Sequence, residues 1–231
     1  MPRLTRLLKP GAPAEPKRQA ALIARALAHT DAHQAQPLHA AELADRAGCH
    51  GPPTPGDPEM QVTRFATLPE GLVALTATAR GMVDHHMTRA AQQAYGELMP
   101  TVGRAGLMAQ VASLISIVPD DPQGPDDPQC RFVAGVVFGY AMADGRGQGR
   151  QPELPLGGSL AWQTLSAGRY AVFTHLGPYT RLHASWDAIY RNGLPASGQT
   201  LRDAPPLELM IHHPGNTAPE DLHTEIWLPI E

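Results

Sequence analysis

Between Gly168 and Glu231 the apolar and polar positions change period in a way that predicts a strand, a helix and two further strands. Residues 170–174 are apolar and β-prone, which is typical of a strand. The dipeptide Gly177-Pro178 favours a helix start, because the fixed φ angle of proline suits a first helical turn. We expect the helix that follows to bury one face, which consists of Leu182, Trp186, Ile189 and Tyr190.

Two carboxylates stand on the polar sides of the last two expected strands. In residues 207–213, Glu208 and Met210 alternate with apolar residues, and in residues 224–230, Glu225 and Trp227 do the same. Glu208 and Glu225 are therefore expected to face either water or a cleft. We expect the apolar residues of both strands to pack on the helix, namely Leu207, Leu209, Ile211, Ile226, Leu228 and Ile230.

The part of the chain before residue 168 repeats this pattern. The expected elements are strands at 61–68 and 72–78, a helix at 82–99, strands at 112–118 and 131–138, a linker at 139–158 and a strand at 159–165. Leu68–Gly71 aligns with Leu165–Gly168, and Gly81 with Gly177, so the body contains two similar units. We expect units 60–138 and 159–231 to join about a pseudo-twofold axis and to leave a ligand cleft between them.

Composition narrows the classes of function. The chain of 231 residues has 42% hydrophobic residues and a net charge of −4, which excludes a strongly basic nucleic-acid-binding protein. No apolar run reaches the roughly 18 residues of a membrane span, and the first residues lack the apolar core of a secretory signal. We expect a cytoplasmic protein that does not enter membranes, with Cys49 and Cys130 as reduced thiols.

Neither a metal nor a cofactor is expected. His29 and His33 have the i,i+4 spacing of two ligands on one helix face, but no third ligand accompanies them, so exposed histidines are the simpler interpretation. The partner that the sequence does suggest is a small molecule.

The first fifty residues have a character of their own. Residues 1–17 are expected to be a disordered lead, and residues 18–50 to form two short helices. The string ALIARALAHTDAHQAQPLHAAELADRAGC resembles the opening of the DNA-binding domain of AraC/XylS-type regulators. The next residues, HGPPTPGDPEM, contain four prolines where that family has its recognition helix. We interpret 18–50 as a truncated remnant and 51–59 as a linker, and we do not expect DNA binding.

The body, residues 60–231, carries a second resemblance. The segments IVPDDPQGPDDPQCRFVAGVVF, GRYAVFTHLGPYTRLHASWDAIYRNGLPASG, PPLELMIHHP and APEDLHTEIWLPIE resemble the GyrI-like small-molecule-binding domain, the effector-binding domain of AraC- and MerR-type multidrug regulators. The resemblance implies an α+β fold made of a tandem repeat of strand-helix-strand-strand modules. It also implies a cleft between the halves that binds amphipathic molecules, often cationic and aromatic.

The resemblance further implies which residues form the site. Glu208 and Glu225 match the acidic strand positions, and Trp186 and Tyr190 match the "W..IY" helix. Further ring contributors are Tyr170, Phe173 and Trp227, while Met210 stands where an aromatic residue is common. A ligand cation could offset the cost of a carboxylate on an apolar wall. In the alternative interpretation, both carboxylates lie on a solvated sheet face, and Trp186 and Tyr190 are core residues.

Three functions remain open from the sequence. The first is a binding protein, monomeric or homodimeric, that sequesters drugs or senses an effector. The second is a hydrolase of strained cyclopropanoid molecules, with Glu225 or Glu208 as general base and Tyr179 or Tyr190 as proton donor. The third is a DNA-binding transcriptional regulator or a gyrase-interacting inhibitor.

Overall fold

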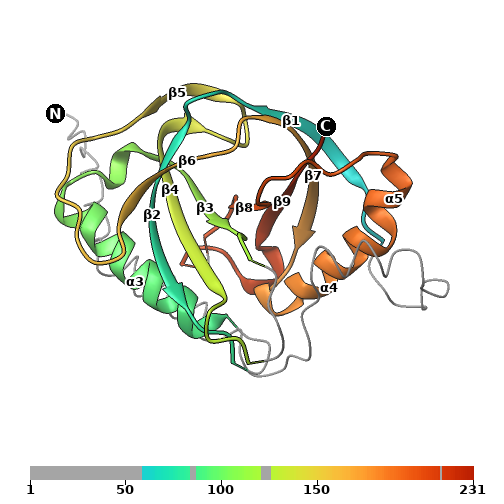
Figure 1. Ribbon diagram of the computed structural model, residues 1–231, viewed down its shortest axis with the longest axis horizontal. Coiled ribbons are helices and arrows are strands. Elements are labelled where there is room, and N and C mark those ends of the chain that lie inside the picture. The colour runs from blue at the N-terminus through green and yellow to red at the C-terminus, as the bar shows by residue number, and fades with distance from the viewer. Residues whose placement is uncertain (1–58, 84–86, 121–125, 214) are drawn as a thin grey trace, which may run out of the picture.

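The computed structural model describes residues 59–231, except 84–86, 121–125 and 214 (Figure 1). The expected lead 1–17, the helical remnant 18–50 with His29, His33 and Cys49, and nearly all of the linker 51–59 lie outside the described residues.

A single antiparallel sheet of nine strands forms the framework. Its order is β1-β7-β9-β8-β3-β4-β2-β6, and β5 pairs with β4 beside this path. The strands are β1 (Val62–Leu68), β2 (Val73–Arg80), β3 (Val111–Ile117), β4 (Arg131–Ala141), β5 (Arg146–Arg150), β6 (Ala161–Thr164), β7 (Gly168–Leu176), β8 (Leu207–Met210) and β9 (His223–Pro229).

The short connection between β1 and β2 shows that this sheet is curled. β1 stands at one end of the strand order and β2 next to the other end, yet only residues 69–72 join them. The backbone N–H of Leu165, just after β6, donates to the carbonyl of Leu72 at 2.9 Å and ties the same region together. The two ends of the sheet therefore approach each other, and the sheet resembles an open half-barrel (Figure 1).

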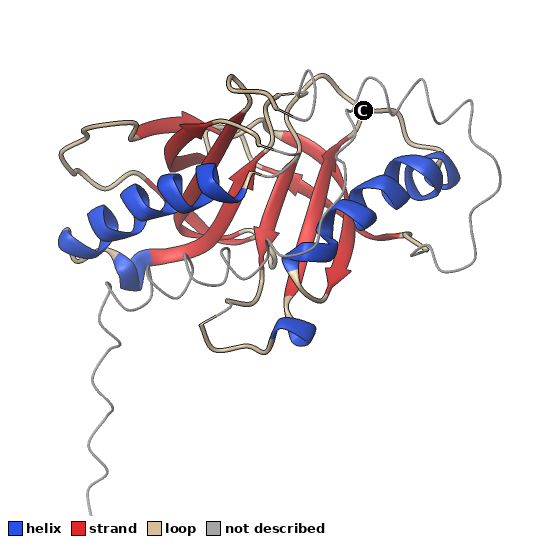
Figure 2. Cartoon of the chain, turned by 90° about the horizontal axis from the view of Figure 1, so that it is seen from below, coloured by secondary structure: helices blue, strands red, loops and turns tan. Residues whose placement is uncertain are grey.

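Two helical segments cover one face of the sheet and leave a space between them. One is α3 (Thr88–Arg104); the other runs from a 3-10 turn (Tyr179–Arg181) through α4 (Leu182–Ala188) and a π-helical turn (Ile189–Gly193) to α5 (Leu194–Ser197). Figure 2 shows both on the same side of the strands, well apart. Short 3-10 turns occupy Met108–Gln110 and Pro219–Asp221. None of the described helices is long and apolar enough to cross a membrane.

The buried apolar residues form three clusters that follow this layout. One joins α3 to β2, β3 and β4, and a second joins the α4–α5 segment to β7 and β9. The third lies on the other face of the sheet, where the curl brings residues of both sheet ends together, among them Leu68, Leu165, Tyr170 and Trp227. The helix-bearing face is thus packed at its two sides and carries polar residues in its middle.

Most predicted elements are present, with three differences. The helix expected at 82–99 begins only at Thr88. Residues 139–158, expected to be a linker, contain the end of β4 and all of β5, because backbone pairing to β4 holds the glycine-rich segment without apolar side chains. Leu207 and Leu209 do not pack on the helix as expected but lie on the opposite face of the sheet, whereas Ile226, Leu228 and Ile230 do pack on it.

Candidate functional site

The middle of the helix-bearing face is formed by β3, β8 and β9. Ser116 of β3 lies directly opposite Glu208 of β8, and Met210 lies between Leu114 of β3 and Thr224 of β9. Residues opposite each other in neighbouring strands point to the same side of a sheet. The side chains of Ser116, Glu208, Met210 and Thr224 therefore share the face between the two helical segments.

Glu208 is the acidic group of this region, and two neutral donors hold its carboxylate. The Ser116 hydroxyl donates to Oε2 at 2.6 Å, and the Trp186 indole N–H donates to Oε1 at 2.8 Å. Burial raises the pKa of Glu208, and these two hydrogen bonds oppose the rise. No ion pair to Glu208 is found in the described part of the chain. When ionised, this carboxylate has no cation to balance it there.

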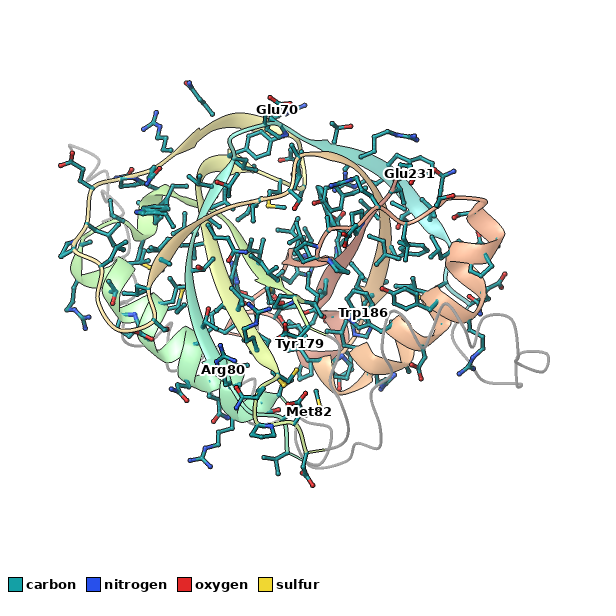
Figure 3. All side chains as sticks on the ribbon, in the orientation of Figure 1. Glu70, Arg80, Met82, Tyr179, Trp186 and Glu231 are labelled. Atoms are coloured by element: carbon teal, nitrogen blue, oxygen red, sulfur yellow. The ribbon has the colours of Figure 1, made fainter. Side chains whose placement is uncertain are left out.

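Aromatic side chains from the α4 segment stand over the carboxylate. The rings of Trp186 and Tyr190 are stacked, with centroids 6.0 Å apart and planes at 17°. Tyr190 is buried among the residues of the second cluster, and Trp186 packs against that cluster. Tyr179, in the 3-10 turn, has a strongly raised pKa because it is buried and faces the charge of Glu208. Figure 3 shows Tyr179 and Trp186 near each other in the middle of the molecule.

The α3 side contributes a tyrosine and a thioether. Tyr95 is fully buried, and its hydroxyl donates to the carbonyl of Ile115 at 3.0 Å and lies 3.6 Å from Sδ of Met210. The pKa of Tyr95 is raised by burial and by the nearby Tyr179 and Glu208. Its ring meets that of Phe132 edge-on, with centroids 5.9 Å apart. Neutral aromatic rings thus surround the carboxylate from the α4 and α3 sides, and the sulfur of Met210 lies on the α3 side.

Glu225, the other predicted carboxylate, lies on the opposite face of the sheet. It stands opposite Leu209, whose side chain points away from the helices. Arg64 of β1 holds both of its oxygens, at 3.2 Å from Nε and 2.8 Å from Nη2, and Trp227 donates its indole N–H at 2.9 Å. The expectation that Glu208 and Glu225 share one cleft is therefore not met, because Glu225 is a paired charge elsewhere.

The remaining predicted residues divide in the same way. Trp186 donates to Glu208 and stacks on Tyr190, and Met210 lies on the same face of β8 as Glu208. Tyr170 and Trp227 are buried on the other face, with ring centroids 5.8 Å apart. Phe173 is on the helix-bearing face but is fully buried beneath the α4 segment.

Sequence reasoning missed three contributors to the site, namely Ser116, Tyr95 and Thr224. Ser116 could have been found, since it is the polar residue in the apolar run Leu114–Ile117. Tyr95 lies on the buried face of its helix, where its hydroxyl gives no separate signal in the sequence. The Thr224 hydroxyl is buried without a hydrogen bond of ordinary geometry, although its proximity slightly lowers the pKa of Tyr179.

The arrangement suits a guest that brings positive charge and apolar surface together. A partly buried carboxylate is costly when it is ionised and unpaired, and aromatic faces attract cations. Residues 64–231 match the family described as the GyrI-like small molecule binding domain. The chain belongs to this GyrI-like family. The binding of small molecules is thus the family's described role, and no match to this chain is found among curated proteins.

Solved structures are similar to this chain at low sequence identity. In the cryo-EM structure of the EcmrR–DNA complex, the match has a TM-score of 0.50 and 16% identity, and covers 73% of this chain and 56% of that chain. The chain therefore corresponds to little more than half of that protein. The EcmrR C-terminal domain matches with a TM-score of 0.48 and 16% identity over 73% of this chain and 96% of that one. SAV2435 bound to tetraphenylphosphonium gives 0.41 and 19%, over 73% and 93%.

Proposed function

We propose that this GyrI-like protein binds small amphipathic molecules with a cationic, aromatic character at the site around Glu208, and that it sequesters them or senses them as effectors. The observation that carries the proposal is the charge imbalance at this site. Glu208 accepts hydrogen bonds from Ser116 and Trp186, but no cationic group faces it among the described residues. A cationic guest would supply the positive charge that balances Glu208.

The surroundings of Glu208 support a greasy cation over a small inorganic one. Tyr179, Trp186 and Met210 offer ring faces and a polarisable sulfur instead of the several oxygen ligands that a hard metal ion requires. Delocalised organic cations carry a small hydration penalty per charge and gain from contact with rings. Met210, with its flexible thioether, suits guests of different shapes.

We further propose that the fold is a tandem duplication and that the guest binds between its two copies. The strand order supports this, since β2-β4-β3 and β7-β9-β8 have the same arrangement on either side of the β3–β8 pair. In each half, one helix connects the first strand of the triplet to the next one in sequence. Glu208 and Ser116 meet where the halves join.

Two ions of equal shape and opposite charge test the proposed ligand class. We expect tetraphenylphosphonium to bind saturably by isothermal titration calorimetry, and tetraphenylborate to bind at least about tenfold more weakly, which is about 1.4 kcal/mol. Glu208→Gln should abolish this preference, because the amide carries no charge. Glu225→Gln is the matched control and should retain it, since that charge lies on the other face. Equal affinity for both ions would contradict the proposal.

A second candidate function is the hydrolysis of strained cyclopropanoid rings with Glu208 as general base. The raised pKa of Glu208 favours this role, because a base works best when its pKa lies near the working pH. Glu225 is the weaker candidate, since Arg64 and Trp227 occupy its oxygens. Mass spectrometry of a cyclopropanoid alkylator incubated with the protein should then reveal a water adduct that Glu208→Gln abolishes. A bound but unchanged compound would reject the enzyme.

A further inference from the structure

Two donors from separate elements converge on the carboxylate of Glu208. Ser116 comes from the central strand β3 and is 1% exposed, and its hydroxyl lies 2.6 Å from Oε2. Trp186 comes from α4 and places its indole N–H 2.8 Å from Oε1. Each carboxylate oxygen thus receives one hydrogen bond from a different direction.

These donors favour one protonation state of Glu208. An indole N–H can only donate, so it stabilises the ionised carboxylate and offers nothing to a proton on the same oxygen. A serine hydroxyl can donate or accept, but its hydrogen bond to a charged carboxylate is the stronger of the two. Burial has the opposite effect, because it favours the neutral form. The balance between burial and the two donors therefore decides whether Glu208 carries its charge.

The two hydrogen bonds also leave acceptor positions of the carboxylate unused. A carboxylate has about four acceptor positions, and Ser116 and Trp186 use one on each oxygen. They fix the plane of the group while both oxygens keep a free position.

We propose that Ser116 and Trp186 are positioning residues that hold Glu208 ionised and oriented, so that a cationic guest meets a charge already formed. This inference rests on the proposed function for its consequence in binding. The protonation state of Glu208 itself is independent of the proposed function and can be measured without any ligand.

No other described side chain is found to stabilise the ionised form of Glu208. The titratable groups that face Glu208 are the phenols of Tyr179, from the 3-10 turn, and Tyr95, from α3. The pKa values of both are raised, so both stay neutral at physiological pH. Neither contributes positive charge, and among the described residues no charged group acts on the pKa of Glu208.

A pair of variants of equal shape isolates the hydroxyl of Ser116. Ser116→Thr keeps the hydroxyl, and Ser116→Val replaces it with a methyl group, so any cost of the extra carbon is common to both. We would follow the side-chain carboxyl carbons of 13C-labelled glutamate by NMR over pH, and Glu208→Gln would assign the signal of Glu208. We expect Ser116→Val to titrate about one pH unit above Ser116→Thr. Equal midpoints would overturn the proposal for Ser116.

Trp186→Phe tests the second donor in the same way. The phenyl ring keeps an aromatic face toward Tyr190 but has no N–H, so the midpoint of Glu208 should again rise. In the double variant with Ser116→Val, the two rises should add, because the donors serve different oxygens. A midpoint that stays at the wild-type value in Trp186→Phe would remove Trp186 from the proposal.

The pH profile of tetraphenylphosphonium binding separates this inference from the proposed function. We expect affinity to fall as pH drops, with the fall centred about one unit higher in Ser116→Val than in Ser116→Thr, and with equal affinities well above both midpoints. A loss of affinity that is the same at every pH would indicate a structural role instead. If the wild type binds no such cation at any pH, the proposed function fails while the titration still decides the role of Ser116.

Discussion

Glu208 and Glu225 lie on adjacent strands and accept the same kind of hydrogen bond, yet their surroundings differ in one charge. Each takes an indole N–H, from Trp186 at 2.8 Å and from Trp227 at 2.9 Å. The second partner of Glu225 is the guanidinium of Arg64, whereas that of Glu208 is the hydroxyl of Ser116. Glu225 thus has a cationic partner, whereas Glu208 has none among the described residues.

This difference separates a carboxylate with a cationic partner in the fold from one without, among the described residues. The Arg64–Glu225 pair joins the edge strand β1 to the interior of the sheet across β7, so it contributes to the fold. Glu208 stands between two helices that do not touch it with any positive group among the described residues. Sequence alternation marks both residues alike, and only their hydrogen-bond and ion-pair partners distinguish them.

Arg64→Ala should have the largest effect on stability. It leaves Glu225, whose side chain is only 10% exposed, as a buried charge without a cationic partner, although the indole hydrogen bond from Trp227 remains. We expect a loss of about 2–3 kcal/mol in the free energy of unfolding, less than for a fully buried pair because the Arg64 side chain is 33% exposed. Urea unfolding followed by circular dichroism measures it. The double variant Arg64→Ala/Glu225→Gln should recover part of the loss, and a full loss there would show that packing, not charge, was responsible.

Replacing each tryptophan by phenylalanine compares the two indole hydrogen bonds directly. Trp227 is 1% exposed and packs against Tyr170, so Trp227→Phe removes both a hydrogen bond and core volume, and should cost about 2 kcal/mol. Trp186 is only half-buried, so Trp186→Phe should cost about 1 kcal/mol or less. Chemical denaturation of both variants under one condition measures the difference. Equal costs would mean that the two regions are equally rigid.

The pH dependence of stability should distinguish the carboxylates by a smaller effect. The pKa of Glu208 is raised in the folded protein, so the proton it binds stabilises the fold at low pH, and that contribution is lost as pH rises through the folded pKa. Relative to the wild type, Glu208→Gln should therefore gain stability as pH rises above about 4.5. Unfolding free energies measured from pH 4 to 8 test this, and a gain that appears on acidification would contradict it.

Most strands of the fold could be predicted from the sequence, but which face of the sheet each side of a strand occupies could not. Period-two alternation correctly separates Glu208 from Leu207 and Leu209, and Glu225 from Ile226. The register between the strands then decides how these sides combine. Leu207 pairs with Trp227, so the apolar side of β8 aligns with the side of β9 that carries Glu225. The register depends on contacts across the whole sheet, so the sequence of a single strand does not reveal it.

Two other features lay beyond sequence reasoning for similar reasons. β5 has the sequence RGQGR and is exposed along its whole length, so no apolar alternation announces it, and pairing with β4 alone defines it. The helical segment after Tyr179 passes through a π-helical turn at Ile189–Gly193, which no sequence signal indicated. A side chain at position 193 would collide with the carbonyl of Met60 and the ring of Phe173. The apolar face of that segment was predicted, and its residues Ile189 and Tyr190 are buried.

The exchange of first strands between the halves has a consequence for how the chain can be divided. β1 precedes the first triplet but pairs with β7 of the second, and β6 precedes the second triplet but pairs with β2 of the first. Each half on its own would therefore carry a strand with nothing to bind and would lack the strand that shields its outer edge. A cut within residues 151–158 would separate β1 from β7 and β6 from β2, so the two fragments should need to reassociate and should not fold as independent domains.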